Sequence, residues 1–194
     1  MDFAKLIERA KAIVLSPKTE WEKIAVETTD TKSLFLNYAI ILAAIPAIAG
    51  FLGTVRFSFG VAIGTAVVGY VLGLVALFVI GIIINALAGT FGATSNADQA
   101  MKVAVYSSTP GWLAGVFNII PIAGSLIALI GGLYGVYLLY LGLSPLMKNT
   151  EDKSVGYTAL IVVCWVLLLF VIGLLTTSLF MGGAMLGAGA GMFR

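Results

Sequence analysis

The longest uncharged stretch is the feature that most limits how this chain can fold. Between Arg56 and Asp98 there is no charged residue, and most of the stretch is apolar. It exceeds the roughly 20 apolar residues that an α-helix needs to cross about 30 Å of hydrocarbon. Of all residues, 60% are hydrophobic and only 10% are charged, too few to cover the surface of a soluble fold. The sequence therefore predicts an integral membrane protein.

Polar interruptions divide the apolar part of the chain, residues 34–181, into five predicted spans. The polar stretches 94–99 and 148–153 are predicted loops, and 118–124, which contains Pro121, is a predicted tight hairpin. We expect an all-α, polytopic transmembrane helical bundle with spans at 34–54, 61–88, 103–120, 122–143 and 157–180. No charge separates spans three and four, so the alternative is a re-entrant pair that does not cross fully.

The first 33 residues form a separate, amphipathic segment. They carry six basic and six acidic residues and no uninterrupted apolar core, which is unlike a signal peptide. Apolar residues recur at helical spacing over 3–14, and Ser16-Pro17 ends that helix and begins a second. Such helices lie in the membrane interface, where Trp21 would be an anchor at headgroup depth. The alternative is that they pack on the end of the bundle.

The two ends of the chain are predicted to lie on opposite sides of the membrane. Five spans with a cytoplasmic N-terminus give nine basic residues inside and two outside, which fits the usual excess of Lys and Arg on the cytoplasmic side. We therefore expect a multi-pass protein of the cytoplasmic (inner) membrane with its C-terminus outside. The Gly-rich residues 182–194 are predicted to be a flexible tail. The inner set is Lys5, Arg9, Lys11, Lys18, Lys23, Lys32, Lys102, Lys148 and Lys153, and the outer set is Arg56 and Arg194.

The residue types leave little room for catalysis. There is no histidine, which removes the commonest general base and metal ligand, and the single cysteine, Cys164, lies in an apolar run. No acid or base lies inside a predicted span, where ion-coupled carriers usually keep one. A net charge of +2 is too small to indicate a nucleic-acid-binding surface. We predict no catalytic residue, cofactor or metal, with the lipid bilayer and other membrane proteins or a second copy as partners.

A few polar side chains inside the predicted spans are candidates for structural contacts or for a solute pathway. Their expected role is hydrogen bonding between helices. Hydroxyl groups just before Pro110 are also placed to satisfy the carbonyls that the proline frees. The alternative role is to line a path for a neutral or lipid-like solute. The candidates are Asn85, Ser107, Ser108, Thr109, Asn118, Tyr134 and the run 176–178.

Glycines four residues apart recur in the predicted spans two, three and four. Such pairs allow close helix packing. We expect packing within the chain, and homodimerisation is the alternative. The pairs are Gly60/Gly64, Gly69/Gly73, Gly111/Gly115 and Gly131/Gly135.

Three short motifs resemble the Yip family of Ypt/Rab-GTPase-interacting membrane proteins, in a prokaryotic-type form. They are Pro17-x-x-x-Trp21 before the first span, the segment from Tyr106 to Pro110 that opens span three, and the segment from Asn118 to Pro121 that closes it. A Gly-Tyr-x-x-x-Pro element of the eukaryotic branch is matched except that Val105 replaces its glycine. The resemblance implies a non-enzymatic protein that organises or shapes membrane or recruits partners.

Three functions are therefore compared. The first is the organising or recruiting protein that the resemblance implies. The second is a small channel or permease for a neutral or lipid-like solute. The third, a lipid-directed enzyme, would have to take its acid or base from a loop, and the nearest candidate, Asp98, is more readily explained as the cap of the helix that leads into span three.

Overall fold

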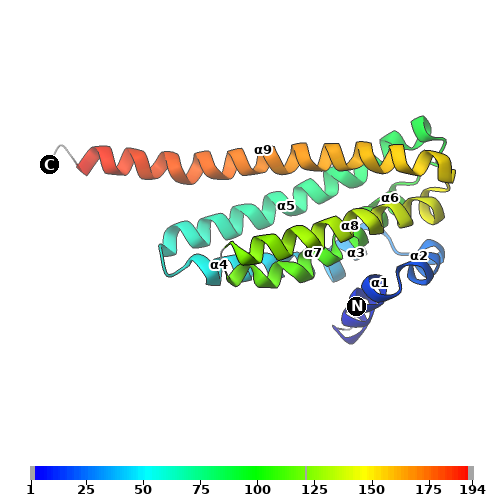
Figure 1. Cartoon of the computed structure of the whole chain (residues 1–194), viewed down its shortest axis with the longest axis horizontal. Helices are drawn as coiled ribbons and strands as arrows, with labels where there is room; N and C mark the ends of the chain where they lie inside the picture. The colour runs from blue at the N-terminus through cyan, green and yellow to red at the C-terminus, as the bar shows by residue number, and fades with distance from the viewer. Residues whose placement is uncertain (1–2, 121, 192–194) are drawn as a thin grey trace.

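The computed structural model describes residues 3–120 and 122–191 and is built of helices that run side by side (Figure 1). Four of them are long and apolar enough to cross a membrane: Thr31–Thr54, Phe59–Phe91, Ala123–Met147 and Asp152–Ser178. The prediction of a polytopic helical membrane protein is confirmed. Four continuous helices are found where five were predicted, because the third predicted span is broken.

Two short helices precede the bundle, as the apolar spacing predicted. α1 (Phe3–Leu15) ends before Ser16, and α2 (Pro17–Val26) has its proline in the first turn, where the missing N–H costs nothing. Both lie against one end of the bundle (Figure 1). We call these two helices, with Glu27, the N-terminal clasp.

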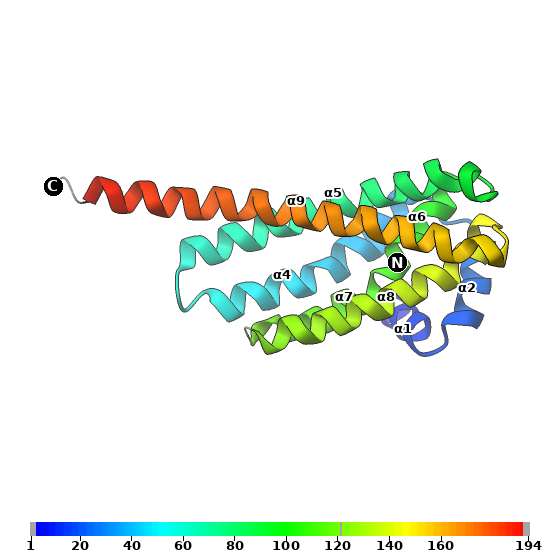
Figure 2. The same cartoon turned by 45° about the horizontal axis from the view of Figure 1, so that its top comes forward.

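The first two spans are an antiparallel pair. The chain enters through α3 (Thr31–Leu34) and a π-helical turn, η1 (Phe35–Ala39), and continues as α4 (Ile40–Thr54). After a short loop, α5 (Phe59–Leu87) returns and ends in the 3₁₀ turn η2 (Ala88–Phe91). α5 packs on both α4 and α9, and Figure 2 shows it between them.

The third predicted span consists of three pieces, α6 (Ala97–Ser107), α7 (Thr109–Ala114) and the 3₁₀ turn η3 (Gly115–Ile119). The break falls at Ser108, two residues before Pro110, which has no N–H to continue the helical ladder. The pieces nevertheless follow α8 from end to end. A Cβ on Gly135 would lie 2.6 Å from the carbonyl oxygen of Ser107, and one on Gly124 would lie 1.9 Å from that of Phe117.

The last two helices are α8 (Ala123–Met147) and α9 (Glu151–Gly191). α9 is the longest helix and continues past the others (Figure 1). The predicted flexible tail is therefore helical from 182 to Gly191, with no break that separates it from the span. Residues 192–194 of that tail lie outside the described residues.

Close packing at glycines agrees with the prediction in one half of the bundle only. Gly131 lies against Pro110 and Ala114, and Gly115 lies against Pro46. In contrast, Cβ atoms added to Gly69 or Gly73 would meet nothing within 4 Å. The expected close packing is therefore seen for the pairs in spans three and four, whereas these two glycines of span two face open space.

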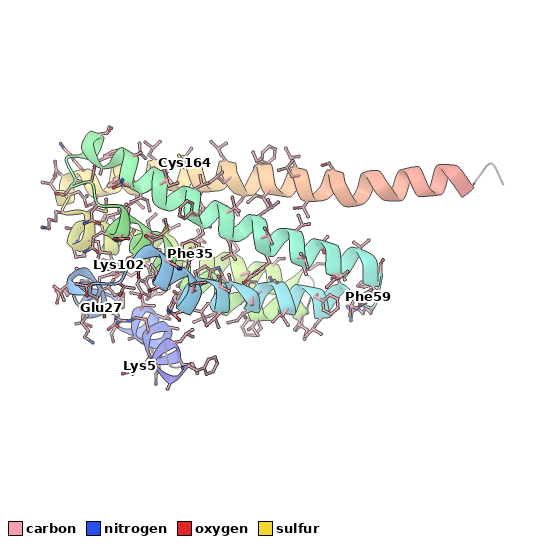
Figure 3. The ribbon with its side chains drawn as sticks, turned by 180° about the vertical axis from the view of Figure 1, so that it is seen from behind. Lys5, Glu27, Phe35, Phe59, Lys102 and Cys164 are labelled. Carbon is pink, nitrogen blue, oxygen red and sulfur yellow. The ribbon has the colours of Figure 1, made fainter. Side chains whose placement is uncertain are left out.

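The buried core is concentrated at one end, where the clasp, α6 and the last turns of α8 meet. Its largest fully buried side chains include Trp21, Tyr38, Lys102 and Met147. Figure 3 shows Glu27 and Lys102 at this end and Phe59 at the other. We call the end with Lys102 the polar end, and the end with the α4–α5 loop the opposite end.

Candidate functional site

An ion-pair network ties α1 to α2 at the polar end. The Arg9 guanidinium contacts the carboxylates of both Glu20 and Glu27, and Lys23 adds an Nζ–Oε2 contact of 3.1 Å to Glu20. Glu20 is only 4% exposed. A carboxylate buried this deeply is stable only when its charge is paired, so Arg9 is needed to close the two helices on each other.

Lys102 of α6 joins the clasp to the bundle. Its side chain is buried, and its Nζ donates hydrogen bonds to the carbonyl oxygens of Ile24, at 3.2 Å, and of Glu27. These carbonyls belong to the C-terminal end of α2, which lacks helical partners and attracts a cation. Burial lowers the pKa of Lys102, an effect that the nearby carboxylates of Glu27 and Asp98 oppose.

Two further side chains of α6 bind the segment before the first span. Gln99 Nε2 donates to the carbonyl of Ala25 at 2.9 Å, again at the end of α2. Asp98 Oδ1 accepts from the backbone N–H of Thr31 at 3.1 Å and from its hydroxyl at 2.7 Å. Asp98 therefore binds the start of α3. The expectation that it caps its own helix is wrong, because Asn96 accepts from the N–H of Gln99 there.

Aromatic rings fill the space beneath the ion pairs. Tyr106 meets Trp21 edge to face with centroids 6.2 Å apart, and meets Tyr38 at 4.9 Å. The Arg9 guanidinium lies 5.9 Å from the centre of the Tyr106 ring, within the range of a cation–π contact. The Trp21 indole also lies so close to Gly142 of α8 that a Cβ there would be 2.7 Å from it. Trp21 is 1% exposed, so it faces the bundle, and its predicted role as a headgroup anchor is corrected.

The hydroxyl groups around Pro110 have separate environments. Tyr38 and Thr109 share a buried hydrogen bond of 2.9 Å between α4's entry turn and α7. Ser108 Oγ donates back to the carbonyl of Ala104 at 2.9 Å, a common arrangement in membrane helices. Ser107 Oγ is buried and, among the described side chains, has no hydrogen-bond partner. Pro110 itself is buried in the first turn of α7.

The remaining candidate positions are spread over the bundle. Tyr134 of α8 donates to the carbonyl of Val14 at 2.7 Å and so fastens the end of α1. Asn85 is half-buried in α5, and its Oδ1 has no partner among the described residues. Asn118 lies at the opposite end, where its backbone oxygen would be 2.6 Å from a Cβ on Gly53. Pro121 lies outside the described residues.

The candidates therefore do not all lie together. Trp21, Tyr106, Thr109 and Tyr134 meet at the clasp, and Asn85 and Asn118 do not. Cavities of about 460 and 430 Å³ are present, and none of the predicted pathway residues lines either one. In the part of the chain that the structure describes, no group of three His, Cys, Asp or Glu residues could hold a metal.

Sequence reasoning missed the two charged residues that the clasp buries, Glu20 and Lys102. Lys102 is expected outside the predicted spans, on the cytoplasmic side, whereas it lies inside a helix and is 2% exposed. The available signal was its position one turn after Asp98 and Gln99, on a helix that leads directly into an apolar segment.

Comparison with known proteins identifies relatives over nearly the whole chain. Residues 11–193 match the Yip1 domain. The inner membrane protein YohC of Escherichia coli strain K12 is 27% identical over 178 residues, which cover 84% of this chain and 91% of that protein. YohC from Escherichia coli O6:H1 gives the same values. No solved structure matches the chain.

Proposed function

Because the chain belongs to the Yip1 domain family, we propose that it is a non-enzymatic, multi-pass protein of the inner membrane that organises membrane or recruits partners through its N-terminal clasp. The name of the relative YohC supports the inner membrane as its location. The docking of the clasp by Arg9, Lys102 and Trp21 is the observation that carries the proposal. It holds a charged surface at a fixed place beside the membrane.

We further propose that the chain crosses the membrane five times, with the N-terminus cytoplasmic and the C-terminus outside. The broken segment 103–120 would be the third span. Its far end, η3, lies beside Gly53 at the end of α4, which supports a full crossing over a re-entrant pair. A membrane-impermeant maleimide added outside should label a cysteine at Ile120, on a Cys164→Ser background. Labelling only after the membrane is opened would refute the crossing.

Part of the apolar surface of the clasp stays exposed when the clasp is docked. Phe3, Ile7 and Leu15 of α1 are 65%, 52% and 68% exposed, while Leu6, Ala10 and Ile13 are buried against the bundle. An exposed apolar face on an amphipathic helix inserts into the headgroup region and can favour curvature. The face turned to the bundle holds the helix in place, and the other face is free for lipid or for a partner.

Reconstitution into liposomes tests this function. Replacing Phe3, Ile7 and Leu15 together with Gln removes the exposed apolar face without touching the buried one. The intact protein should change liposome diameter or tubulation in electron micrographs, or retain a stoichiometric membrane protein during purification, and the triple variant should lose that effect. A matched variant, Lys5→Gln with Lys18→Gln, should keep it. If intact protein and triple variant behave alike in both assays, the proposal is wrong.

The alternative, a small channel or permease, has less support from the contacts. Tyr134, Thr176 and Ser178 hydrogen-bond to backbone carbonyls at 2.7, 2.8 and 3.0 Å, and none of them lines a described cavity. Solute flux through proteoliposomes that is lost in an Asn85→Leu variant would favour this alternative over the first function.

A further inference from the structure

A groove of about 460 Å³ lies between α1 and the first half of α4. This volume is within the range of sites that hold small ligands. Its walls are apolar side chains from α1 and α4, together with Leu113 of α7, and among the described residues Lys11 is the charged residue that lines it. The α1 side of the groove includes residues one helical turn apart, Ile7, Lys11 and Leu15.

The groove opens toward the space that lipid would occupy. Its α4 wall, Ile41, Leu42 and Ile45, belongs to the candidate span Thr31–Thr54. Ile41 is 41% exposed there. Figure 3 shows α1, with Lys5 near its start, projecting away from the side of the bundle below Phe35. α1 thus projects beside a membrane-spanning helix, and apolar side chains line the space between the two helices.

Lys11 gives this apolar groove a charged edge. Its side chain is exposed, and among the described residues no ion pair or hydrogen bond engages it. Its neighbour in the same helix, Arg9, is instead turned toward Glu20 and Glu27. An unpaired ammonium at the edge of a hydrocarbon-lined groove matches the chemistry of a phospholipid, whose anionic phosphate lies at the top of its acyl chains.

We propose that this groove is a phospholipid site, in which one acyl chain lies between α1 and α4 and the phosphate contacts the Lys11 ammonium. The inference requires only that α4 lies in the membrane. It adds a ligand to the proposed function and can hold even if the clasp neither shapes membrane nor recruits a partner.

Native mass spectrometry of protein purified in mild detergent tests the site. The intact chain should retain about one phospholipid. Ile41→Trp places a large ring in the groove and should abolish retention. Ile48→Trp is the matched control, since Ile48 is 59% exposed on the same face of α4, two turns further on and outside the groove. Lys11→Gln should lower lipid occupancy about fivefold, as expected for one lysine that contacts an anionic headgroup, whereas Lys5→Gln should not change it.

Photo-crosslinking in a bilayer provides a readout that does not depend on purification. Liposomes that contain a phospholipid with a diazirine in its acyl chain should give adducts on both α1 and the peptide around Ile41, and Ile41→Trp should give fewer α1 adducts than Ile48→Trp. Equal retention in Ile41→Trp and Ile48→Trp, adducts on α4 alone, or crosslinks between two copies of the chain at this groove would each overturn the proposal. If the lipid site passes these tests while the intact protein and the triple variant at Phe3, Ile7 and Leu15 behave alike in both the liposome and the purification assay, the proposed function is refuted and the lipid site still stands.

Discussion

The two ends of the bundle are held together by different physics. At the polar end, Glu20 and Lys102 are buried and Arg9 is half-buried, and charged groups or backbone carbonyls of α1 and α2 are their partners. At the opposite end, η3 and α4 meet through backbone contacts that only glycine permits, as at Gly53. Hydrogen bonds and charges specify one partner and one register, whereas small residues allow close approach. Hydrogen bonds and charges thus fix the position of the clasp, whereas close packing at small residues fixes the opposite end.

Substitutions at each end test the polar contacts and the glycine contacts separately, and most of these tests need a reporter for clasp docking. Ala10, on the buried face of α1, is 4% exposed. On a Cys164→Ser background, the rate at which a maleimide modifies Ala10→Cys measures the undocked fraction. A loss of 1.4 kcal/mol in docking free energy raises that rate about tenfold.

Removal of the central ring of the clasp should have the largest effect. Trp21→Ala deletes a side chain that is 1% exposed between Tyr106 and Gly142. Truncating a buried Trp costs about 3–5 kcal/mol, so labelling at position 10 should rise by more than about a hundredfold. Trp165→Ala on α9 is the control and should leave labelling unchanged. A Trp21→Ala chain with intact protection would mean that the clasp does not depend on this contact.

Loss of the ion pairs should be the next largest effect. Arg9→Met leaves Glu20 buried with only the exposed Lys23 as a partner, and an unpaired buried charge costs about 3 kcal/mol. The labelling rate should rise by roughly a hundredfold. Lys5→Met, on the same helix, should give the rate of the intact chain. Equal rates in the two variants would show that the ion pairs contribute nothing to docking.

Substitutions at the opposite end should destabilise the bundle without releasing the clasp. In Gly53→Ala the new Cβ would lie 2.6 Å from the carbonyl oxygen of Asn118. Overpacking against backbone costs about 1–3 kcal/mol, which thermal unfolding in detergent should detect. Gly50→Ala, one turn away with nothing within 4 Å, should be neutral or stabilising by about 0.5–1 kcal/mol. A Gly53→Ala chain as stable as Gly50→Ala would contradict the close approach of η3.

The smallest effect is expected at Lys102, and it should depend on pH. Lys102→Met leaves the carbonyls of Ile24 and Glu27 without their donor, at about 1 kcal/mol. Burial lowers the pKa of Lys102 below its ordinary 10.5, so between the lowered value and 10.5 the undocked state binds more protons. Docking of the intact chain should therefore strengthen as pH rises through that window, relative to Lys102→Met at each pH. A constant difference between the two would show that Lys102 does not titrate there.

Sequence patterns predicted those parts of the fold that depend on local spacing. The face of α1 with Leu6, Ala10 and Ile13, and the start of α2 at Pro17, were both visible because helical periodicity and proline act locally. The same pattern could not decide between lipid and bundle for Trp21, since either surface satisfies an apolar face. The structure decides it through Gly142, a residue far away in the sequence.

The polar contacts escaped prediction for a different reason. Because Lys102 and Glu20 are charged, hydropathy predicts that both side chains are exposed to water. Their burial is stable only with partners distant in the sequence, such as the free carbonyls at the end of α2. The break in the third span was also missed, although Pro110 was visible. A proline weakens a helix locally, but whether the helix stops depends on its neighbours, here the close approach of α8 at Gly131 and Gly135.

A distance measurement between spin labels tests the docked clasp most directly. Labels at Lys18 of α2 and Lys148 after α8, both exposed, should give one narrow distance distribution in lipid bilayers, because α2 is fixed against the last turns of α8. The distribution should broaden in Trp21→Ala. A broad distribution in the intact chain, unchanged by that substitution, would place the N-terminal helices on the lipid surface and contradict the account.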